Sequence, residues 1–175
     1  EATPPPRAAL LPHIWLSDEE SRQGQRLLEQ LPDKAGTPPI ALHPYATHPD
    51  KAWKEAYWRQ LMELFESRGI PWIVIGRGNG MEGIPASRNF TNRTSLRETC
   101  ALLKSSSLLI TGDSGPMHLA GAVGTPVLAL FGPTTEEWGF FPAGPKDRVL
   151  ESQLDCRPCT LHGKKHCDRN HACMQ

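Results

Sequence analysis

Short apolar runs alternate along this chain with longer amphipathic stretches. The apolar runs predict β-strands at residues 40–43, 70–75, 107–111 and 127–132, with a short strand at 89–91 and an edge strand at 148–150. The amphipathic stretches predict helices that begin at a capping box on Ser17, near Trp53, at a second capping box on Ser95, and at Pro116. Pro32, Gly69 and residues 124–126 are expected to end three of these helices. The alternation predicts an α/β domain, a Rossmann-like parallel sheet with helices on both faces.

One junction between a strand and a helix carries the strongest functional signal. Gly112 and Gly115 follow a predicted buried strand and let the backbone approach a ligand, and Pro116 suits the first position of a helix. The start of a helix leaves unpaired backbone N–H groups, which together with the helix dipole favour a phosphate. Ser114 can add a hydroxyl, and His118, about one turn into the helix, faces the same mouth. The sequence therefore predicts an anion-binding turn at the carboxyl end of this strand.

Each candidate residue also has a purely structural interpretation. Asp113 and Ser114 are frequent helix caps, and His118 can be a half-buried, hydrogen-bonded histidine. Lys51 follows the first predicted strand and can reach a phosphate, although a surface lysine is usually only solvated. The glycine-rich residues 76–80 lack the lysine and serine of a P-loop, so a flexible turn is the default interpretation there.

Composition bounds the class of protein. The chain has 175 residues and 38% hydrophobic content, enough for one core. Lysine plus arginine and aspartate plus glutamate number 19 each, which gives no reason to expect a nucleic-acid surface. No apolar run reaches the ~20 residues that span a bilayer, and residues 1–7 resemble no signal peptide, so we expect a cytoplasmic, not a transmembrane, protein. The proline-rich start suggests a fragment cut at a connector. We expect a connector at 1–16, a Rossmann-like domain at 17–152 and a cysteine-rich segment at 153–175.

The last segment holds four cysteines, with histidines between them: Cys156, Cys159, Cys167 and Cys173. In a reducing compartment, thiolates suit a closed tetrahedral zinc site better than disulfides. One Cys-x-x-Cys pair is present, but Cys167 and Cys173 are separated by five residues instead of two. A structural zinc ion, one or two disulfides, and free thiols therefore all stay open.

These motifs resemble those of a known family. The sequence is similar to the bacterial ADP-heptose:lipopolysaccharide heptosyltransferases, glycosyltransferase family nine, on Gly112-Asp113-Ser114-Gly115-Pro116-Met117-His118-Leu119-Ala120, Gly124-Thr125-Pro126 and Phe131-Gly132-Pro133-Thr134. Supporting matches are His43-Pro44-Tyr45-Ala46 with Lys51 and Trp53, residues 89–96, and the cysteine-rich end. The resemblance implies the C-terminal, donor-binding half of a two-domain GT-B glycosyltransferase.

The resemblance also implies a reaction. In that family a hydroxyl of the lipopolysaccharide core attacks the anomeric carbon of ADP-heptose, and ADP leaves with inversion and without a required cofactor. The catalytic base and the acceptor site would come from an N-terminal domain outside this chain. No catalytic residue is expected here, and we expect the fragment to bind donor without turnover.

The resemblance assigns roles to individual residues. Asp113 would meet the sugar hydroxyls, while Ser114, Gly115 and Lys51, with His118, would contact the diphosphate. The remaining implied contacts are Ala46 and Thr47 at the phosphate, and Thr134, which by itself suggests only a turn, at the sugar pocket.

Some alternatives stay open. The family holds the ribose with an acidic residue where Gly78 and Asn79 stand here, and Glu82 comes several residues later, so the donor's base and sugar are not fixed. A non-catalytic nucleotide-binding module and a zinc-stabilised interaction domain are the competing functions. The chain has no Gly-x-Ser-x-Gly elbow and no GxGxxG that opens a helix after the first strand, which argues against a hydrolase or a dehydrogenase. Peripheral attachment to the inner membrane is an option for the full-length enzyme.

Overall fold

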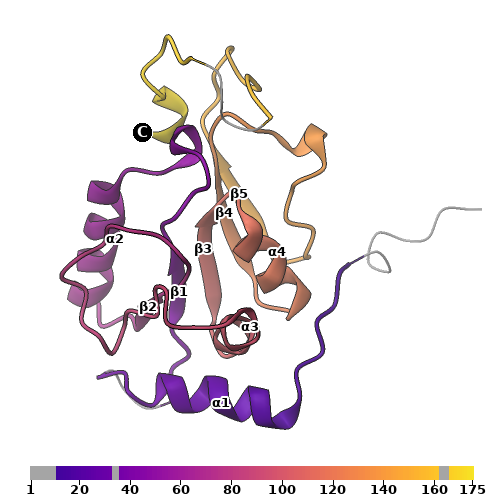
Figure 1. The fold of residues 1–175 in the computed structure, drawn as a ribbon. Coiled ribbons are helices and arrows are strands. Elements are labelled where there is room, and N and C mark those ends of the chain that lie inside the picture. Colours follow the sequence, from indigo (N-terminus) through magenta and orange to yellow (C-terminus); the bar gives the residue numbers. More distant parts are fainter. Residues whose placement is uncertain (1–10, 33–35, 162–165) are drawn as a thin grey trace, which may run out of the picture.

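A five-stranded parallel sheet forms the centre of the molecule (Figure 1). The computed structural model describes residues 11–32, 36–161 and 166–175. The strands lie in the order β2-β1-β3-β4-β5, and their bounds are β1 (Ile40–His43), β2 (Trp72–Val74), β3 (Leu108–Gly112), β4 (Val127–Phe131) and β5 (Arg148–Glu151). All four neighbouring pairs are parallel, with β5 at the edge as predicted.

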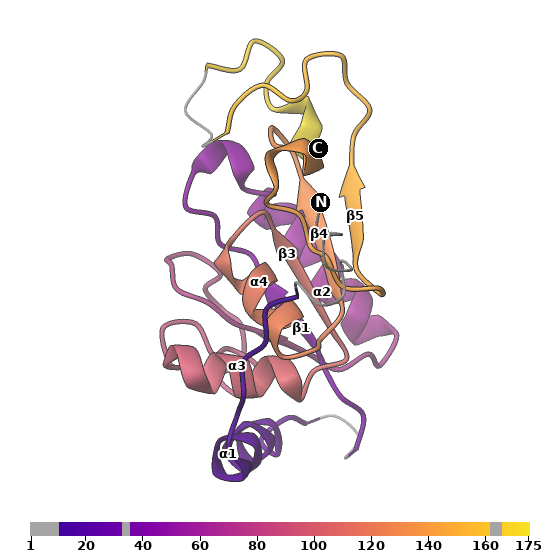
Figure 2. The ribbon, with the colours of Figure 1, turned by 90° about the vertical axis from the view of Figure 1, so that its right-hand side faces the viewer.

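Helices cover both faces of this sheet, which confirms the predicted fold class (Figures 1 and 2). Their bounds are α1 (Asp18–Leu28), α2 (Glu55–Ser67), α3 (Leu96–Lys104) and α4 (Gly115–Ala122), with the 3₁₀ helices η2 (Pro49–Lys51), η3 (Glu136–Trp138) and η4 (Ala172–Met174). Helix α2 lies on one face, α3 and α4 lie on the other, and α1 packs on the outside of α3. Both predicted capping boxes, on Ser17 and Ser95, are present.

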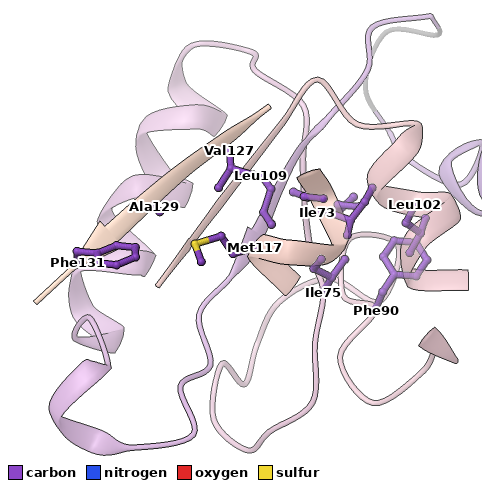
Figure 3. Packing of buried hydrophobic residues seen from close by; sticks show 12 residues of the cluster. Ile73, Ile75, Phe90, Leu102, Leu109, Met117, Val127, Ala129 and Phe131 are labelled. Carbon is purple, nitrogen blue, oxygen red and sulfur yellow. The ribbon is translucent and has the colours of Figure 1, made fainter. Parts of the chain in front are cut away.

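Each face has its own hydrophobic core. Leu109, Val127 and Ala129 point from the sheet towards Met117 of α4 and Leu102 of α3 (Figure 3). The opposite cluster joins the sheet to α2; its buried members are Leu42, Trp58, Met62, Phe65, Trp72, Val74, Met81 and Ile110. Burial on both sides explains why the central strands are continuous apolar runs.

Several predicted boundaries were wrong for local reasons. Residues 89–91 make only an isolated bridge between Asn89 and Val74, because the Asn89 side chain accepts the N–H of Thr91 and turns the chain away. Helix α1 ends at Leu28 instead of reaching Pro32, because the Leu31 N–H donates to the Leu28 carbonyl in a tight turn. In addition, proline disfavours helical geometry at the residue that precedes it. The strand predicted at 70–75 is shorter in the structure, where β2 covers only Trp72–Val74, and the helix expected from Trp53 begins at Glu55.

The described part of the predicted connector lies against the domain. The Ile14 N–H donates to the carbonyl of Ala122 at the end of α4, and Arg97 donates to the carbonyl of Trp15. Residues 1–10 of the connector lie outside the described residues, and the division at 16 and 152 stays a prediction. Within the described ranges, no helix is long and apolar enough to cross a membrane.

Candidate functional site

Three polar side chains meet at the carboxyl end of the sheet. His43 ends β1, and Thr111 is its register partner on β3. The His43 Nδ1 lies 3.1 Å from the Thr111 hydroxyl and 3.2 Å from the Ser114 hydroxyl, and the two hydroxyls are 3.0 Å apart. Parallel register therefore brings together a histidine and two hydroxyl groups that are far apart in the sequence.

His43 is held in its neutral form. Its side chain is buried, and this burial lowers the pKa of His43 to about 4, because the charged imidazolium would lose its hydration. A neutral imidazole has one N–H donor and one acceptor nitrogen, so it can orient the Ser114 and Thr111 hydroxyls without adding charge. The sequence interpretation used His43 only as part of a family resemblance and missed this role.

Ser114 is the N-cap residue of α4, but its side chain makes no capping hydrogen bond. The hydroxyl instead lies in the network with His43 and Thr111, and it also donates to the Gly112 carbonyl at 3.3 Å. The structural alternative, in which Ser114 serves as a helix cap, therefore does not describe this side chain. Without that cap, the first turn of α4 keeps N–H groups that a side chain does not satisfy.

Lys51 and Asp113 form an ion pair beside this network. The Lys51 Nζ lies 2.6 Å from Asp113 Oδ2, and both side chains are largely buried. Lys51 ends η2, in the loop after β1, whereas Asp113 lies in the turn between β3 and α4. Lys51 is thus a fixed, paired cation at the carboxyl edge of the sheet, in contrast to a freely solvated surface lysine.

A cavity of about 430 Å³ opens next to the network. This volume lies within the usual range for a small-molecule site. Four predicted site residues line it, Ala46, Thr47, Ser114 and Gly115. The other lining residues are His43, Tyr45, Gly76, Arg77, Thr94, Leu96, Thr99, Pro116 and Leu119. Hydroxyls, one arginine and two leucines thus surround a helix entrance.

The glycine-rich turn packs closely on this site. Gly76 has φ +122°, and a Cβ there would lie 2.5 Å from Cδ2 of the His43 ring. A Cβ at Gly78 would clash with the Tyr45 ring, whose hydroxyl lies 2.7 Å from the Thr91 hydroxyl. The positive φ of Gly76 and the close approach of the His43 and Tyr45 rings therefore explain why glycines occupy positions 76 and 78.

Four predicted residues lie outside the cavity lining: Lys51 and Asp113, which form the ion pair, and His118 and Thr134. His118 is an exposed residue of α4, and among the described residues it has no hydrogen bond or ion pair. Thr134 follows β4; it is buried, and its hydroxyl has no hydrogen-bond partner in the described part of the chain. All four assignments to the ligand stay predictions.

In the part of it that the structure describes, the cysteine-rich segment has no disulfide between its four cysteines, Cys156, Cys159, Cys167 and Cys173. Among the described residues, which include these four, no three His, Cys, Asp or Glu side chains are placed to hold a metal ion. Zinc ligation or disulfides at these cysteines stay predictions from the sequence, and His162 lies outside the described residues.

The fold and the site define a class. A parallel sheet with helices on both faces, and a cavity at the strands' carboxyl ends beside a helix N-terminus, is an architecture found in the Rossmann-like halves of GT-B glycosyltransferases. The family model for "Glycosyltransferase family 9 (heptosyltransferase)" matches residues 11–168. The chain belongs to this heptosyltransferase family.

Individual relatives agree with this assignment. Lipopolysaccharide heptosyltransferase 1 of Pseudomonas aeruginosa is 35% identical over 153 residues, which cover 79% of this chain and 40% of that protein. The structure of E. coli ADP-heptose LPS heptosyltransferase II matches with a TM-score of 0.63 at 22% identity, over 81% of this chain and 45% of that one. E. coli heptosyltransferase WaaC with ADP matches at 0.54 and 25% identity, over 72% and 41%. This chain therefore spans less than half the length of each of these relatives.

Proposed function

We propose that this chain is the donor-binding half of a heptosyltransferase and that it holds the diphosphate of a nucleotide-sugar, ADP-heptose in the first instance. The observation that carries the proposal is the N-terminus of α4. There the Ser114 hydroxyl makes no capping hydrogen bond and lines the cavity, and the neighbouring Asp113 pairs with Lys51. Backbone N–H groups, a hydroxyl and a nearby ammonium suit a diphosphate. Two similar structures, E. coli ADP-heptose LPS heptosyltransferase II and E. coli heptosyltransferase WaaC with ADP, support this ligand.

The proposed chemistry is inverting glycosyl transfer. An acceptor hydroxyl oxygen forms a bond to the anomeric carbon of the sugar, the bond from that carbon to the diphosphate oxygen breaks, and the hydroxyl proton passes to a base. Negative charge then builds on the departing diphosphate. Lys51 and the N-terminus of α4 would stabilise that charge, because both are positive and fixed before the reaction.

The base and the lipopolysaccharide acceptor site belong, in this proposal, to a part of the enzyme outside this chain. Asp113 is already paired with Lys51, which suits it to accept hydrogen bonds from sugar hydroxyls better than to remove a proton. The chain alone is therefore proposed to bind donor without transferring sugar.

Calorimetric titration of the 175-residue chain with ADP, UDP and GDP tests the binding claim. We expect at least ADP to bind, and failure of all three nucleotides to bind would overturn the proposal.

A transfer assay with radiolabelled ADP-heptose and lipopolysaccharide core tests whether this chain alone can transfer sugar. We expect no product from this chain alone, whereas clear product would contradict it. Binding without transfer, even after an N-terminal half is supplied, would favour a non-catalytic nucleotide-binding module.

A further inference from the structure

The C-terminal segment, whose described residues are 153–161 and 166–175, lies at the same end of the sheet as the candidate site. In Figure 1 the yellow segment that ends in η4 sits beside the η2 turn, above the carboxyl ends of the strands. Two of its side chains, Arg157 and His171, contact the loops that carry Thr134 and Lys51. Neither residue was singled out by the sequence motifs.

Arg157 fastens the loop after β4. Its guanidinium donates to the Gly132 carbonyl, to the Thr134 carbonyl at 3.0 Å and to the Ser152 carbonyl at 2.6 Å, and it pairs with Glu151 at 2.8 Å. The side chain is only 8% exposed. Arginine's planar fork can satisfy several acceptors at once, which a lysine ammonium at the end of a flexible stem cannot reproduce. The Arg157 side chain therefore holds the loop from Gly132 to Thr134 through its backbone carbonyls.

The segment makes further contacts with the same loop. The Cys159 N–H donates to the Pro133 carbonyl at 3.1 Å. Met174 is buried against Gly132, where a Cβ would collide with the Met174 sulfur and would lie 3.4 Å from the sulfur of Cys173. The glycine at position 132 thus leaves room for this close approach.

His171 reaches the second loop. Its Nε2 lies 2.8 Å from Asp50 Oδ1, and Asp50 directly precedes Lys51 within η2. Lys51 in turn pairs with Asp113. One continuous set of contacts therefore runs from the C-terminal segment through Asp50 and Lys51 to the entrance of α4.

We propose that the C-terminal segment positions the donor site, with Arg157 and His171 as positioning residues that hold the Thr134 and Lys51 loops. The inference rests on the proposed function for its binding consequence, but its structural claim can be measured without ligand. Neither side chain needs to touch the nucleotide-sugar. Their effect is to keep two loops in one arrangement before the ligand arrives, which lowers the cost of binding.

The test compares Arg157→Lys and His171→Ala with the matched controls Arg148→Lys and His166→Ala. Arg148 is exposed, and within the described part of the chain its side chain donates only to the neighbouring Asp147 carbonyl; the His166 side chain is 90% exposed. Hydrogen exchange of the ligand-free chain is followed in peptides covering residues 130–136 and 48–54. We expect faster exchange at 130–136 in Arg157→Lys and at 48–54 in His171→Ala, with unchanged exchange in β3 and in both controls.

Nucleotide binding supplies the second readout. We expect ADP binding to weaken by about three- to tenfold in each positioning variant and to stay unchanged in the controls. His171→Gln, which keeps a donor towards Asp50, should recover most of the binding. Unchanged exchange in both loops would overturn the positioning claim whether or not ADP binds. Changed exchange with wild-type ADP affinity would also overturn it, while failure of the wild-type chain to bind ADP would count against the proposed function alone.

Discussion

Lys51 and Asp113 lie 62 residues apart in the sequence, and yet their side chains meet at 2.6 Å. The contact joins the loop after β1 to the turn after β3, since β1 and β3 are neighbouring parallel strands whose carboxyl ends share one edge of the sheet. Both side chains are mostly removed from water, so the loss of one partner would leave the other charge poorly compensated. The pair fixes a cation where the proposed diphosphate docks.

Replacement of Lys51 by alanine is expected to weaken ADP, UDP and GDP binding to a similar extent, by about tenfold or more, because a charge-assisted hydrogen bond to phosphate is lost. Titration calorimetry measures this. Lys54→Ala is the control, because Lys54 is exposed at the start of α2 and lies over the Tyr57 ring instead of facing Asp113. A loss confined to one base would contradict a phosphate role for Lys51.

Ser114→Ala tests the hydroxyl at the entrance of α4. We expect ADP binding to fall by about fivefold to tenfold, since one hydrogen bond to a charged group is removed. The free energy of unfolding should fall by about 1 kcal/mol, because the contacts of the Ser114 hydroxyl with His43, Thr111 and the Gly112 carbonyl are lost, although this side chain does not cap the helix. Ser67→Ala, at the exposed end of α2, is the control for the serine substitution. Unaltered ADP affinity would argue against this role.

Local sequence signals predicted most of the fold. Capping boxes on Ser17 and Ser95 and the continuous apolar runs of β3 and β4 are short-range features, and all of them are present. The predicted strand at 89–91 was wrong because one side-chain hydrogen bond, from the Thr91 N–H to Asn89, decided the local conformation. Competition of this kind between side chain and backbone is difficult to derive from periodicity.

The site was less accessible from the sequence. Ser114 and Gly115 were predicted because they follow a buried strand, and Ala46 and Thr47 because of the family resemblance; the structure places all four around one cavity. The contact between His43 and Thr111 depends on the register of two parallel strands, which no local pattern specifies. Arg157 acts through loop carbonyls, and carbonyl acceptors leave no signature in the sequence.

The contact of α1 with α3 gives a test of packing. A Cβ at Gly24 would lie 2.6 Å from the Ala101 carbonyl oxygen, so the two helices cross at a position without room for a side chain. We expect Gly24→Ala to lower the free energy of unfolding by about 1–3 kcal/mol in urea denaturation, despite alanine's higher helix propensity. Gly121→Ala is the matched control, since a Cβ there meets nothing within 4 Å and alanine should raise stability by up to about 1 kcal/mol. Equal effects of the two substitutions would contradict this view of the α1–α3 contact.

The buried imidazole of His43 predicts how stability depends on pH. Burial lowers the pKa of His43 from 6.5 to about 4 in the folded chain, so between these values the unfolded chain binds a proton that the folded chain does not. With respect to this group, the free energy of unfolding is therefore at its full value above pH 6.5. It falls by about 3 kcal/mol as the pH decreases towards 4.

His43→Asn keeps a polar group near the hydroxyls of Thr111 and Ser114 but does not titrate, so the free energy of unfolding of this variant should fall less over the same range. Urea denaturation at several pH values between 4 and 7 measures the difference. Parallel pH profiles for wild type and His43→Asn would mean that His43 can be protonated in the folded chain, and the neutral hydrogen-bond network around Ser114 would have to be abandoned.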